Sequence, residues 1–181
     1  MQQSINVILV DENDRPLGTM EKMEVHQKAL LHRAFSIFIF NSNNEMLLQQ
    51  RAKNKYHSAG LWTNACCSHP APGSTTLLAA RQRLREEMGF DTILQKAFDF
   101  IYEAPFDNGL TEHEFDHVYI GRYDGVVSPD EAEVSAFCFK SLTEIERDLR
   151  LFPEKYTAWF KIAFPRVEDY FNTLPIATFE P

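Results

Sequence analysis

The segment AFSIFIFNSNNEMLLQQ, residues 34–50, decides the fold of this chain. Residues 34–40 are apolar, aromatic or β-branched except for one serine, which is typical of a buried strand. The polar run NSNN at 41–44 is a hairpin signal, and MLLQQ at 46–50 reads as the returning strand. The segment therefore predicts two strands joined by a tight turn.

A helix is predicted downstream of this hairpin, at residues 75–88. The sequence PAPG at 70–73 breaks the chain before it. A serine or threonine at 74–76 is expected to cap its start, and Gly89 to close its end.

The other elements follow from the same patterns of apolar spacing. Strands are expected at 5–10, 98–102, 112–123 and 134–139, with a turn at 11–14, and helices at 143–149 and 154–171, the last broken near Pro165. Strands mixed with few helices indicate an α/β (α+β) domain rather than a doubly wound one.

Composition narrows the possible partners. The chain has 181 residues, which fits one domain spanning 1–181, and its net charge is −8. An acidic chain argues against nucleic-acid binding, because that affinity comes mainly from basic side chains on phosphates. A small anionic substrate needs only a few cations placed locally. The apolar run at 34–40 is too short to cross a bilayer, so no membrane association is expected.

Cysteine usage and the N-terminus predict a compartment. The three cysteines make no disulfide framework, which suits a reducing cytoplasm. Residues 1–4 lack the basic and apolar regions of a signal peptide. A soluble cytoplasmic protein is expected.

Metal-ligating residue types occur at same-face spacing in two extended segments. Glu112 and Glu114 share a face of one predicted strand, and Cys67 and His69 share a face of another segment. His26 and His32 are six residues apart, a poor helical pair, so a turn must bring them together. Each pair alone is more often packing or an exposed edge than a site.

Taken together, these residues suggest a metal site. Three imidazoles and two carboxylates favour Mn²⁺, Mg²⁺ or Zn²⁺, and the candidate ligands are His26, His32, His69, Glu112 and Glu114.

Cationic residues add a second signal. Arg83 and Glu87 lie four apart on the predicted helix, either as a surface ion pair or as a carboxylate holding Mg²⁺ beside an arginine aimed at a diphosphate. Arg51, Lys53 and Lys55 form a basic cluster whose simpler interpretation is a solvated turn.

Three motifs give the chain a family resemblance. WTNACCSHP at 62–70, LREEMG at 84–89 and EHE at 112–114 together resemble the type I isopentenyl-diphosphate isomerases. The resemblance runs from the first strand to the segment bearing Trp159. It implies a Nudix-like α/β/α sandwich around a mixed β-sheet, and an enzyme that interconverts isopentenyl and dimethylallyl diphosphate.

The resemblance also implies roles for individual residues. The five candidate ligands match the family's divalent-metal ligands. Cys67 and Glu114 match its catalytic pair, with Tyr102 hydrogen-bonded to the carboxylate. Glu87 and the carbonyl of Cys67 match the groups that hold Mg²⁺ on the substrate diphosphate. The positions that match the family's diphosphate-binding side chains are Lys22, Arg51, Lys55 and Arg83. Trp159 matches the indole that lies over the carbon skeleton of the substrate. A monomer or homodimer is expected.

The reaction needs a proton donor and a proton acceptor in fixed geometry, around an intermediate that resembles a tertiary carbocation. The resemblance suggests that Glu114, helped by Tyr102, delivers the first proton and that Cys67 removes the second, but the sequence leaves either direction open. Neighbouring side chains of an extended segment point to opposite faces, so Cys67 but not Cys66 is expected in the pocket. Cations nearby predict some thiolate character at Cys67.

Departures from the hydrolase pattern favour isomerisation. Gln82 and Arg83 stand where a Nudix hydrolase has Arg-Glu, and Ser68 and Ser74 replace its upstream glycine and glutamate. A Nudix hydrolase of a nucleoside diphosphate derivative is the main alternative, and a non-catalytic metal-binding module is the other. Glu103, next to Tyr102, is an acidic residue near the expected diphosphate path and has no assigned role.

Overall fold

The computed structural model describes residues 5–55 and 57–174. Residues 1–4, where no signal peptide is expected, lie outside this part. The central element is strand β3 (His32–Phe40), and strand β8 (Thr111–Arg122) pairs with it in parallel along its whole length. Every residue of β3 except Arg33 is buried, as its apolar sequence predicts.

Three short pairings occupy the other edge of β3. Strand β1 (Asn6–Val10) pairs at His32, β6 (Cys66–Ser68) pairs along the middle, and β4 (Met46–Arg51) pairs only at Phe40. The predicted turn at 41–44 is therefore present, but the two strands separate directly after it because β6 takes the place beside β3. The sheet mixes parallel and antiparallel pairs, as expected.

The remaining strands extend the sheet outward. β2 pairs with β1, β5 and β9 pair with β4, and β7 pairs with β8; their bounds are Pro16–Glu21, Trp62–Thr63, Val134–Lys140 and Leu94–Pro105. Strand β2 has no counterpart in the sequence prediction, because its residues are mostly exposed and give no apolar alternation. The short helix α1 (Lys22–Gln27) that follows was missed as well.

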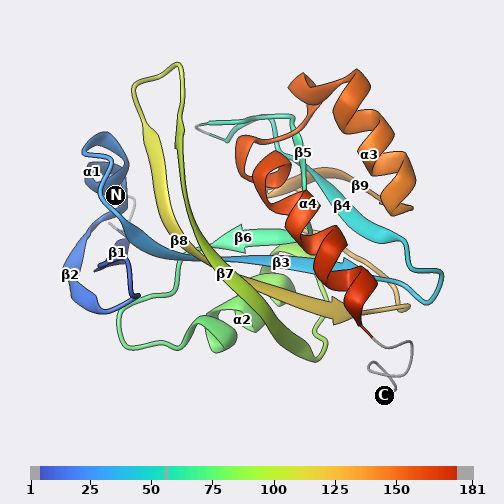
Figure 1. Cartoon of the computed structure of the whole chain (residues 1–181), viewed down its shortest axis with the longest axis horizontal. Coiled ribbons are helices and arrows are strands. Elements are labelled where there is room, and N and C mark those ends of the chain that lie inside the picture. Colours follow the sequence, from blue (N-terminus) through green and yellow to red (C-terminus); the bar gives the residue numbers. More distant parts are fainter. Residues whose placement is uncertain (1–4, 56, 175–181) are drawn as a thin grey trace.

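Helices cover both faces of the sheet. Phe38 and Phe40 pack under helix α4 (Ala158–Thr173), while Ile37 and Ile39 pack under helix α2 (Thr76–Met88). In Figure 1 helix α4 crosses in front of the sheet and α2 lies behind it. Helix α3 (Leu142–Leu151) joins the α4 side. This is the expected α/β/α sandwich.

The predicted break near Pro165 is wrong. Helix α4 continues through Pro165, and the interruption lies earlier, between a 3₁₀ turn (Pro153–Lys155) and the cap residue Thr157. Pro165 removes the hydrogen bond to the carbonyl of Lys161. Both residues are exposed, so water can satisfy that carbonyl and the helix tolerates the proline.

The ends of α2 agree with the prediction. Thr75 accepts a hydrogen bond from the backbone N–H of Leu78, and Gly89 ends the helix with φ +77°. An added Cβ at Gly89 would lie 2.2 Å from the backbone oxygen of Ser128. Both the backbone conformation and this close approach require glycine.

Gly89→Ala should therefore lower the free energy of unfolding by more than about 1–2 kcal/mol, which is the cost of the left-handed conformation alone. Gly73→Ala is the control, because Gly73 has φ +86° but nothing within 4 Å of an added Cβ. Urea titrations measure both. Equal losses in the two variants would mean that the contact with Ser128 costs nothing.

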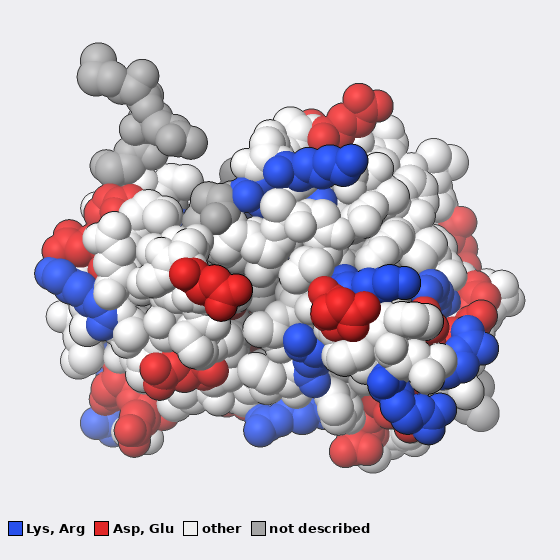
Figure 2. Space-filling model, turned by 90° about the horizontal axis from the view of Figure 1, so that it is seen from above, with Lys and Arg blue, Asp and Glu red and all other residues white. Residues whose placement is uncertain are grey.

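Charges are interspersed on the face shown in Figure 2, where basic side chains lie among acidic ones. Within the described residues, no helix is both long and apolar enough to cross a bilayer.

Candidate active site

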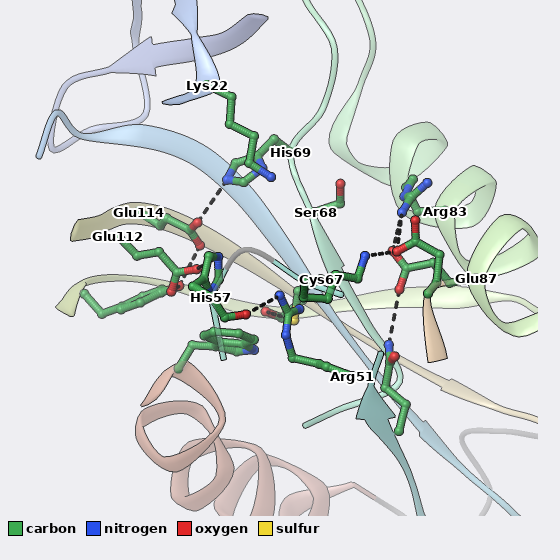
Figure 3. Close-up of a pocket in the computed structure, with 16 residues that line it drawn as sticks. Lys22, Arg51, His57, Cys67, Ser68, His69, Arg83, Glu87, Glu112 and Glu114 are labelled. Atoms are coloured by element: carbon green, nitrogen blue, oxygen red, sulfur yellow. Dashed lines mark hydrogen bonds and ion pairs between the residues drawn. The ribbon is translucent and has the colours of Figure 1, made fainter. Parts of the chain in front are cut away.

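One pocket collects side chains from both edges of β3 and from helices α1, α2 and α4 (Figure 3). In Figure 3 Glu112, Glu114 and His69 lie toward one end, Arg83 and Glu87 toward the other, and Cys67 between them. The lining side chains are Lys22, Ser36, Gln49, Arg51, Lys55, His57, Cys67, Ser68, His69, Arg83, Glu87, Tyr102, Glu112, Glu114, Glu133 and Trp159.

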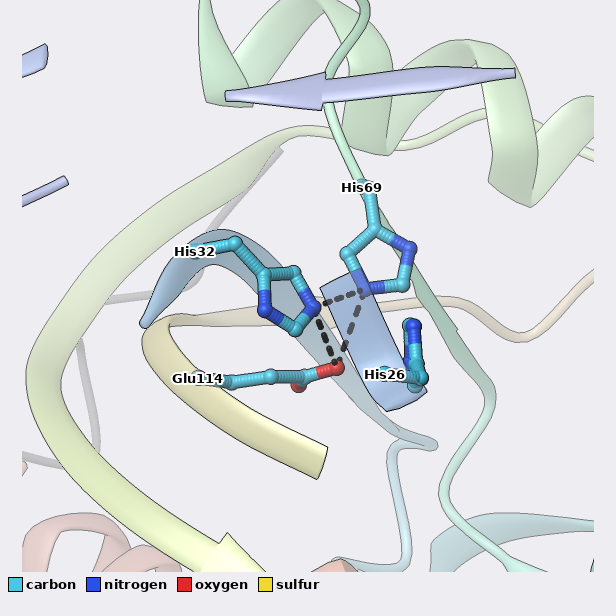
Figure 4. Close-up of side chains that lie close together, drawn as sticks. All are labelled: His26, His32, His69 and Glu114. Carbon is cyan, nitrogen blue, oxygen red and sulfur yellow. Dashed lines mark hydrogen bonds and ion pairs between the residues drawn. The ribbon is translucent and has the colours of Figure 1, made fainter. Parts of the chain in front are cut away.

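Three histidines and a glutamate meet at one end of the pocket (Figure 4). His26 lies in the last turn of α1 and His32 begins β3, and the turn between them brings their ring centroids to 5.0 Å. His69 follows β6, and its Nε2 lies 3.1 Å from His32 Nε2 and 3.0 Å from Glu114 Oε1. One ligand atom from each of the four residues lies within 4.8 Å of all the others. The turn that the spacing of His26 and His32 requires is thus present.

Backbone carbonyls orient two of these rings. Nδ1 of His26 lies 2.7 Å from the carbonyl of Lys22, and Nδ1 of His32 lies 2.8 Å from that of Leu30. A carbonyl only accepts, so each Nδ1 carries the proton and each Nε2 presents a lone pair inward. Nε2 of His26 is buried without a hydrogen-bond partner.

Burial favours the neutral form of two of these imidazoles, those of His26 and His69. It lowers the pKa of His26, and burial together with the positive charge of Lys22 lowers the pKa of His69 to about 3. Burial alone would raise the pKa of Glu114, but hydrogen bonds with His32 and His69 hold it well below its usual range. Neutral imidazoles and an ionised carboxylate are the forms that bind a divalent cation. The donor set therefore fits a metal.

Glu112 lies beside this group rather than within it. Its Oε1 is 3.5 Å from Nε2 of His57, and burial and the charge on Glu114 raise its pKa. The hydroxyl of Tyr102 donates to Glu114 at 2.7 Å and lies 3.1 Å from Glu112. Both carboxylates are buried on the same face of β8, as the alternation predicts, and Glu112 stays a predicted ligand.

The two adjacent cysteines face opposite sides of the sheet. Cys66 is buried in the core under α2, whereas Cys67 lines the pocket. The thiol of Cys67 donates to Asn64 Oδ1 at 3.1 Å and lies 3.4 Å from Ser36 Oγ. Burial and the carboxyl of Asp116 raise the pKa of Cys67 above its ordinary value. These surroundings favour the protonated thiol, contrary to the thiolate character predicted from the sequence.

Cations gather at the other end of the pocket. Arg83 Nη2 lies 2.5 Å from Glu87 Oε1, and Lys55 forms an ion pair with Glu133. The Nε atoms of Arg51 and Arg83 are buried without hydrogen-bond partners. Donors of this kind suit a ligand rich in anionic oxygens. Lys53, which the sequence groups with Arg51 and Lys55, is exposed and does not line the pocket.

Trp159 forms part of the pocket wall and is 3% exposed. The guanidinium of Arg51 lies 5.1 Å from the centre of its ring, and His57 meets it edge-on with ring centroids 5.8 Å apart. The buried indole N–H has no hydrogen-bond partner. Glu103, in contrast, alternates with Tyr102 on β7 and is exposed, outside the pocket.

Sequence reasoning missed several lining residues, among them Ser36, Gln49, His57 and Glu133. The ring of His57 stacks on Phe106 and lines the pocket. Gln49 donates to Glu87 at 3.2 Å from the middle of a buried strand. A polar residue within an apolar strand was the available signal for Ser36 and Gln49. No local pattern marks Glu133.

Comparisons with known proteins place the chain in a family. The NUDIX domain family matches residues 30–160. The chain is 53% identical over 166 residues to an isopentenyl-diphosphate Delta-isomerase of Pectobacterium atrosepticum, covering 92% of this chain and 93% of the relative. It is 52% identical to isopentenyl-diphosphate Delta-isomerase 2 of Aromatoleum aromaticum, over 89% and 85% of the two chains.

The fold is shared more widely. The crystal structure of DR0079 from Deinococcus radiodurans superposes with a TM-score of 0.75 at 17% identity, covering 89% of this chain and 98% of that one. The sequence relatives are similar enough, over enough of their length, to fix the family. The chain belongs to the Nudix family and, within it, to the isopentenyl-diphosphate Delta-isomerases.

Proposed function

We propose that this protein interconverts isopentenyl diphosphate and dimethylallyl diphosphate. The observation that carries the proposal is one pocket that holds a thiol and a carboxylate from opposite edges of β3, Cys67 on β6 and Glu114 on β8. A cationic end and a metal-ligating end complete the same pocket. One domain would suffice, since helices α1, α2 and α4 all contribute to this pocket.

Two proton transfers make up the reaction. A proton added to the terminal alkene carbon gives a tertiary carbocation-like intermediate, and loss of a proton from the carbon next to the CH₂O group gives the product. The Cys67 thiol on one side, and the Glu114 carboxyl with the Tyr102 hydroxyl on the other, are the two proton-transfer groups, one donating and the other accepting. In the reverse direction the roles exchange.

The metal-ligating end would hold one divalent cation through His26, His32, His69 and Glu114, with Glu112 completing the set. Mn²⁺, Mg²⁺ and Zn²⁺ all suit mixed imidazole and carboxylate donors, and we propose one of these. A cation there would supply positive charge that fixes and polarises the carboxyl of Glu114. The histidines and the backbone carbonyls behind them keep that carboxyl in place.

The cationic end would hold the diphosphate. We propose that Arg51, Lys55 and Arg83 contact its oxygens and that Glu87 holds the Mg²⁺ that accompanies it. Lys22, a further proposed contact of the diphosphate, lies beside His69 toward the metal-ligating end (Figure 3). The buried Nε atoms of Arg51 and Arg83 support this, because unpaired buried donors are costly unless a ligand uses them.

Glu87→Gln should raise the KM for the Mg²⁺–diphosphate by about 10–100-fold, which corresponds to losing one charge-assisted contact. The metal held by the histidines should stay, because Glu87 lies at the opposite end of the pocket (Figure 3). Steady-state kinetics at varied Mg²⁺, together with elemental analysis, measures both. If Glu87→Gln instead lost the histidine-held metal, the assignment of Glu87 to the diphosphate-bound Mg²⁺ would be wrong.

Trp159 is proposed to face the cationic carbon skeleton with its ring. Trp159→Leu keeps bulk but removes the π-face, so kcat should fall by about 30-fold, equivalent to about 2 kcal/mol. Trp159→Phe keeps a π-face and should retain more activity. Equal kcat values in the two variants would reduce the indole to a packing role.

The test of the proposed function is incubation with isopentenyl diphosphate and Mg²⁺, followed by proton NMR. Two methyl signals of dimethylallyl diphosphate are expected. Release of inorganic phosphate or of a mononucleotide from nucleoside diphosphate derivatives, without these signals, would indicate a hydrolase instead.

The free thiols support a cytoplasmic location, because all three cysteines are unpaired and such thiols persist in reducing compartments. We propose a cytoplasmic monomer or homodimer that meets its diphosphate substrate in solution.

A further inference from the structure

The segment that carries Cys67 is held by side chains where the sheet is interrupted. Strand β5 ends at Thr63 and β6 begins at Cys66. The carbonyl of Ala65 accepts from Gln49 Nε2 at 2.7 Å, and the carbonyl of Cys66 accepts from Asn64 Nδ2 at 2.9 Å. Buried carbonyls need partners, so these amide side chains replace the missing strand contacts.

Asn64 has only one possible orientation. Its Nδ2 donates to the carbonyls of both Ile37, at 3.0 Å, and Cys66, so both of its N–H groups are used. Its Oδ1 is then an acceptor only, and it accepts from Cys67 Sγ and from Thr63 Oγ1, the latter at 2.9 Å. Asn64 is completely buried. The proton on Cys67 is therefore directed at a fixed oxygen.

The hydrogen bonds continue to helix α4. Thr157 Oγ1 donates to Thr63 Oγ1 at 3.0 Å, and Thr157 also accepts from the backbone N–H of Phe160, which caps the helix. Both threonines are buried. A buried chain of side chains thus joins Cys67, through Asn64 and Thr63, to the first turn of α4, where Trp159 lies.

We propose that Asn64 and Thr63 are positioning residues: Asn64 orients the Cys67 thiol, and Thr63 fixes the start of α4, and with it the Trp159 ring, relative to that thiol. This inference rests on the proposed isomerase activity. Neither residue lines the pocket, so neither contacts the substrate. Proton transfer to and from carbon depends steeply on geometry, and a misplacement of about 1 Å can cost about 100-fold in rate.

Thr63→Val and Thr63→Ser form the central comparison. Valine has the shape of threonine without the hydroxyl, so kcat should fall about 10-fold or more while KM stays within about twofold. Serine keeps the hydroxyl and should restore most of kcat. Thr92→Val removes a hydroxyl that bonds the carbonyl of Arg122, outside the pocket, and controls for general loss of a hydrogen bond. Unchanged kcat in Thr63→Val, with an active wild type, would overturn the inference.

A second measurement does not depend on turnover. The S–H stretching band of Cys67, assigned by its absence in Cys67→Ala, should move to higher frequency in Asn64→Ala because its acceptor is lost. If Asn64→Ala does not fold, Thr63→Val is the deciding variant. It removes the second donor to Asn64 Oδ1, so the hydrogen bond from the Cys67 thiol should become stronger and the band should move to lower frequency. An unmoved band contradicts the orientation of the thiol. A wild type without isomerase activity would instead contradict the proposed function, and the band shift would still stand.

Discussion

Cys67→Ala should abolish isomerisation, with kcat lowered by about 100–10,000-fold, because one of two proton-transfer groups is removed. The variant should still bind the metal and the diphosphate, since the proposed contacts of both are with other side chains. Proton NMR measures turnover, and elemental analysis and isothermal titration with the product measure binding. Binding without turnover is the expected combination.

Cys66→Ala is the matched control for Cys67→Ala. Cys66 points into the core under α2, so its replacement removes a buried sulfur and should cost stability but little activity. The two cysteines are neighbours in sequence but point to opposite faces of the strand, so the pair of variants distinguishes a chemical role from a packing role. An inactive Cys66→Ala beside an active Cys67→Ala would show that the catalytic assignment is wrong.

His69→Ala should remove the metal and the activity together. His69 Nε2 lies close to both His32 and Glu114, so its loss opens the group of donors and removes one of the partners of Glu114. The lost electrostatic support amounts to several kcal/mol, which corresponds to at least about 100-fold in kcat. Elemental analysis of the purified variant and NMR turnover test the two losses. A chelator should likewise inactivate the wild type, and added divalent cation should restore it.

His117→Ala is the control for His69→Ala. His117 is a buried histidine on β8 as well, but it lies beside Asp14 and does not line the pocket. This variant should keep its metal and its activity. Full turnover by a demonstrably metal-free wild type would contradict a requirement for the histidine-held cation, although the diphosphate-bound Mg²⁺ could still be needed.

Much of the fold follows from local sequence because the deciding segments carry strong local patterns. Residues 34–40 are apolar on both faces, and this strand is buried between two helical layers. Helix α2 has both a capping threonine and a closing glycine. Strand β2 and helix α1 carry no such pattern, because one is an exposed edge and the other has only six residues. Their existence depends on contacts with the rest of the molecule.

The residues of the site also fall into those that local sequence patterns predict and those that only the folded structure reveals. Alternation along a strand correctly places Glu112 with Glu114, and Cys67 with His69, since it needs only neighbouring residues. Glu133 reaches Lys55 across 78 positions of sequence, and Thr157 reaches Thr63 across 94. Pairs so distant have no spacing rule, so only the folded chain reveals them. Burial, which raises the pKa of Cys67, is likewise a property of the folded structure.

The parallel pairing of β3 with β8 has a consequence for synthesis of the chain. The ribosome completes AFSIFIF about 80 residues before Arg122, the end of the strand that shields it. At roughly 5–20 residues per second, this segment waits for roughly 4–16 s without its partner. It has high β-propensity and neither charge nor proline, which is the composition that associates between chains. The strand that organises the active site is therefore also a segment through which unfinished chains can associate with one another.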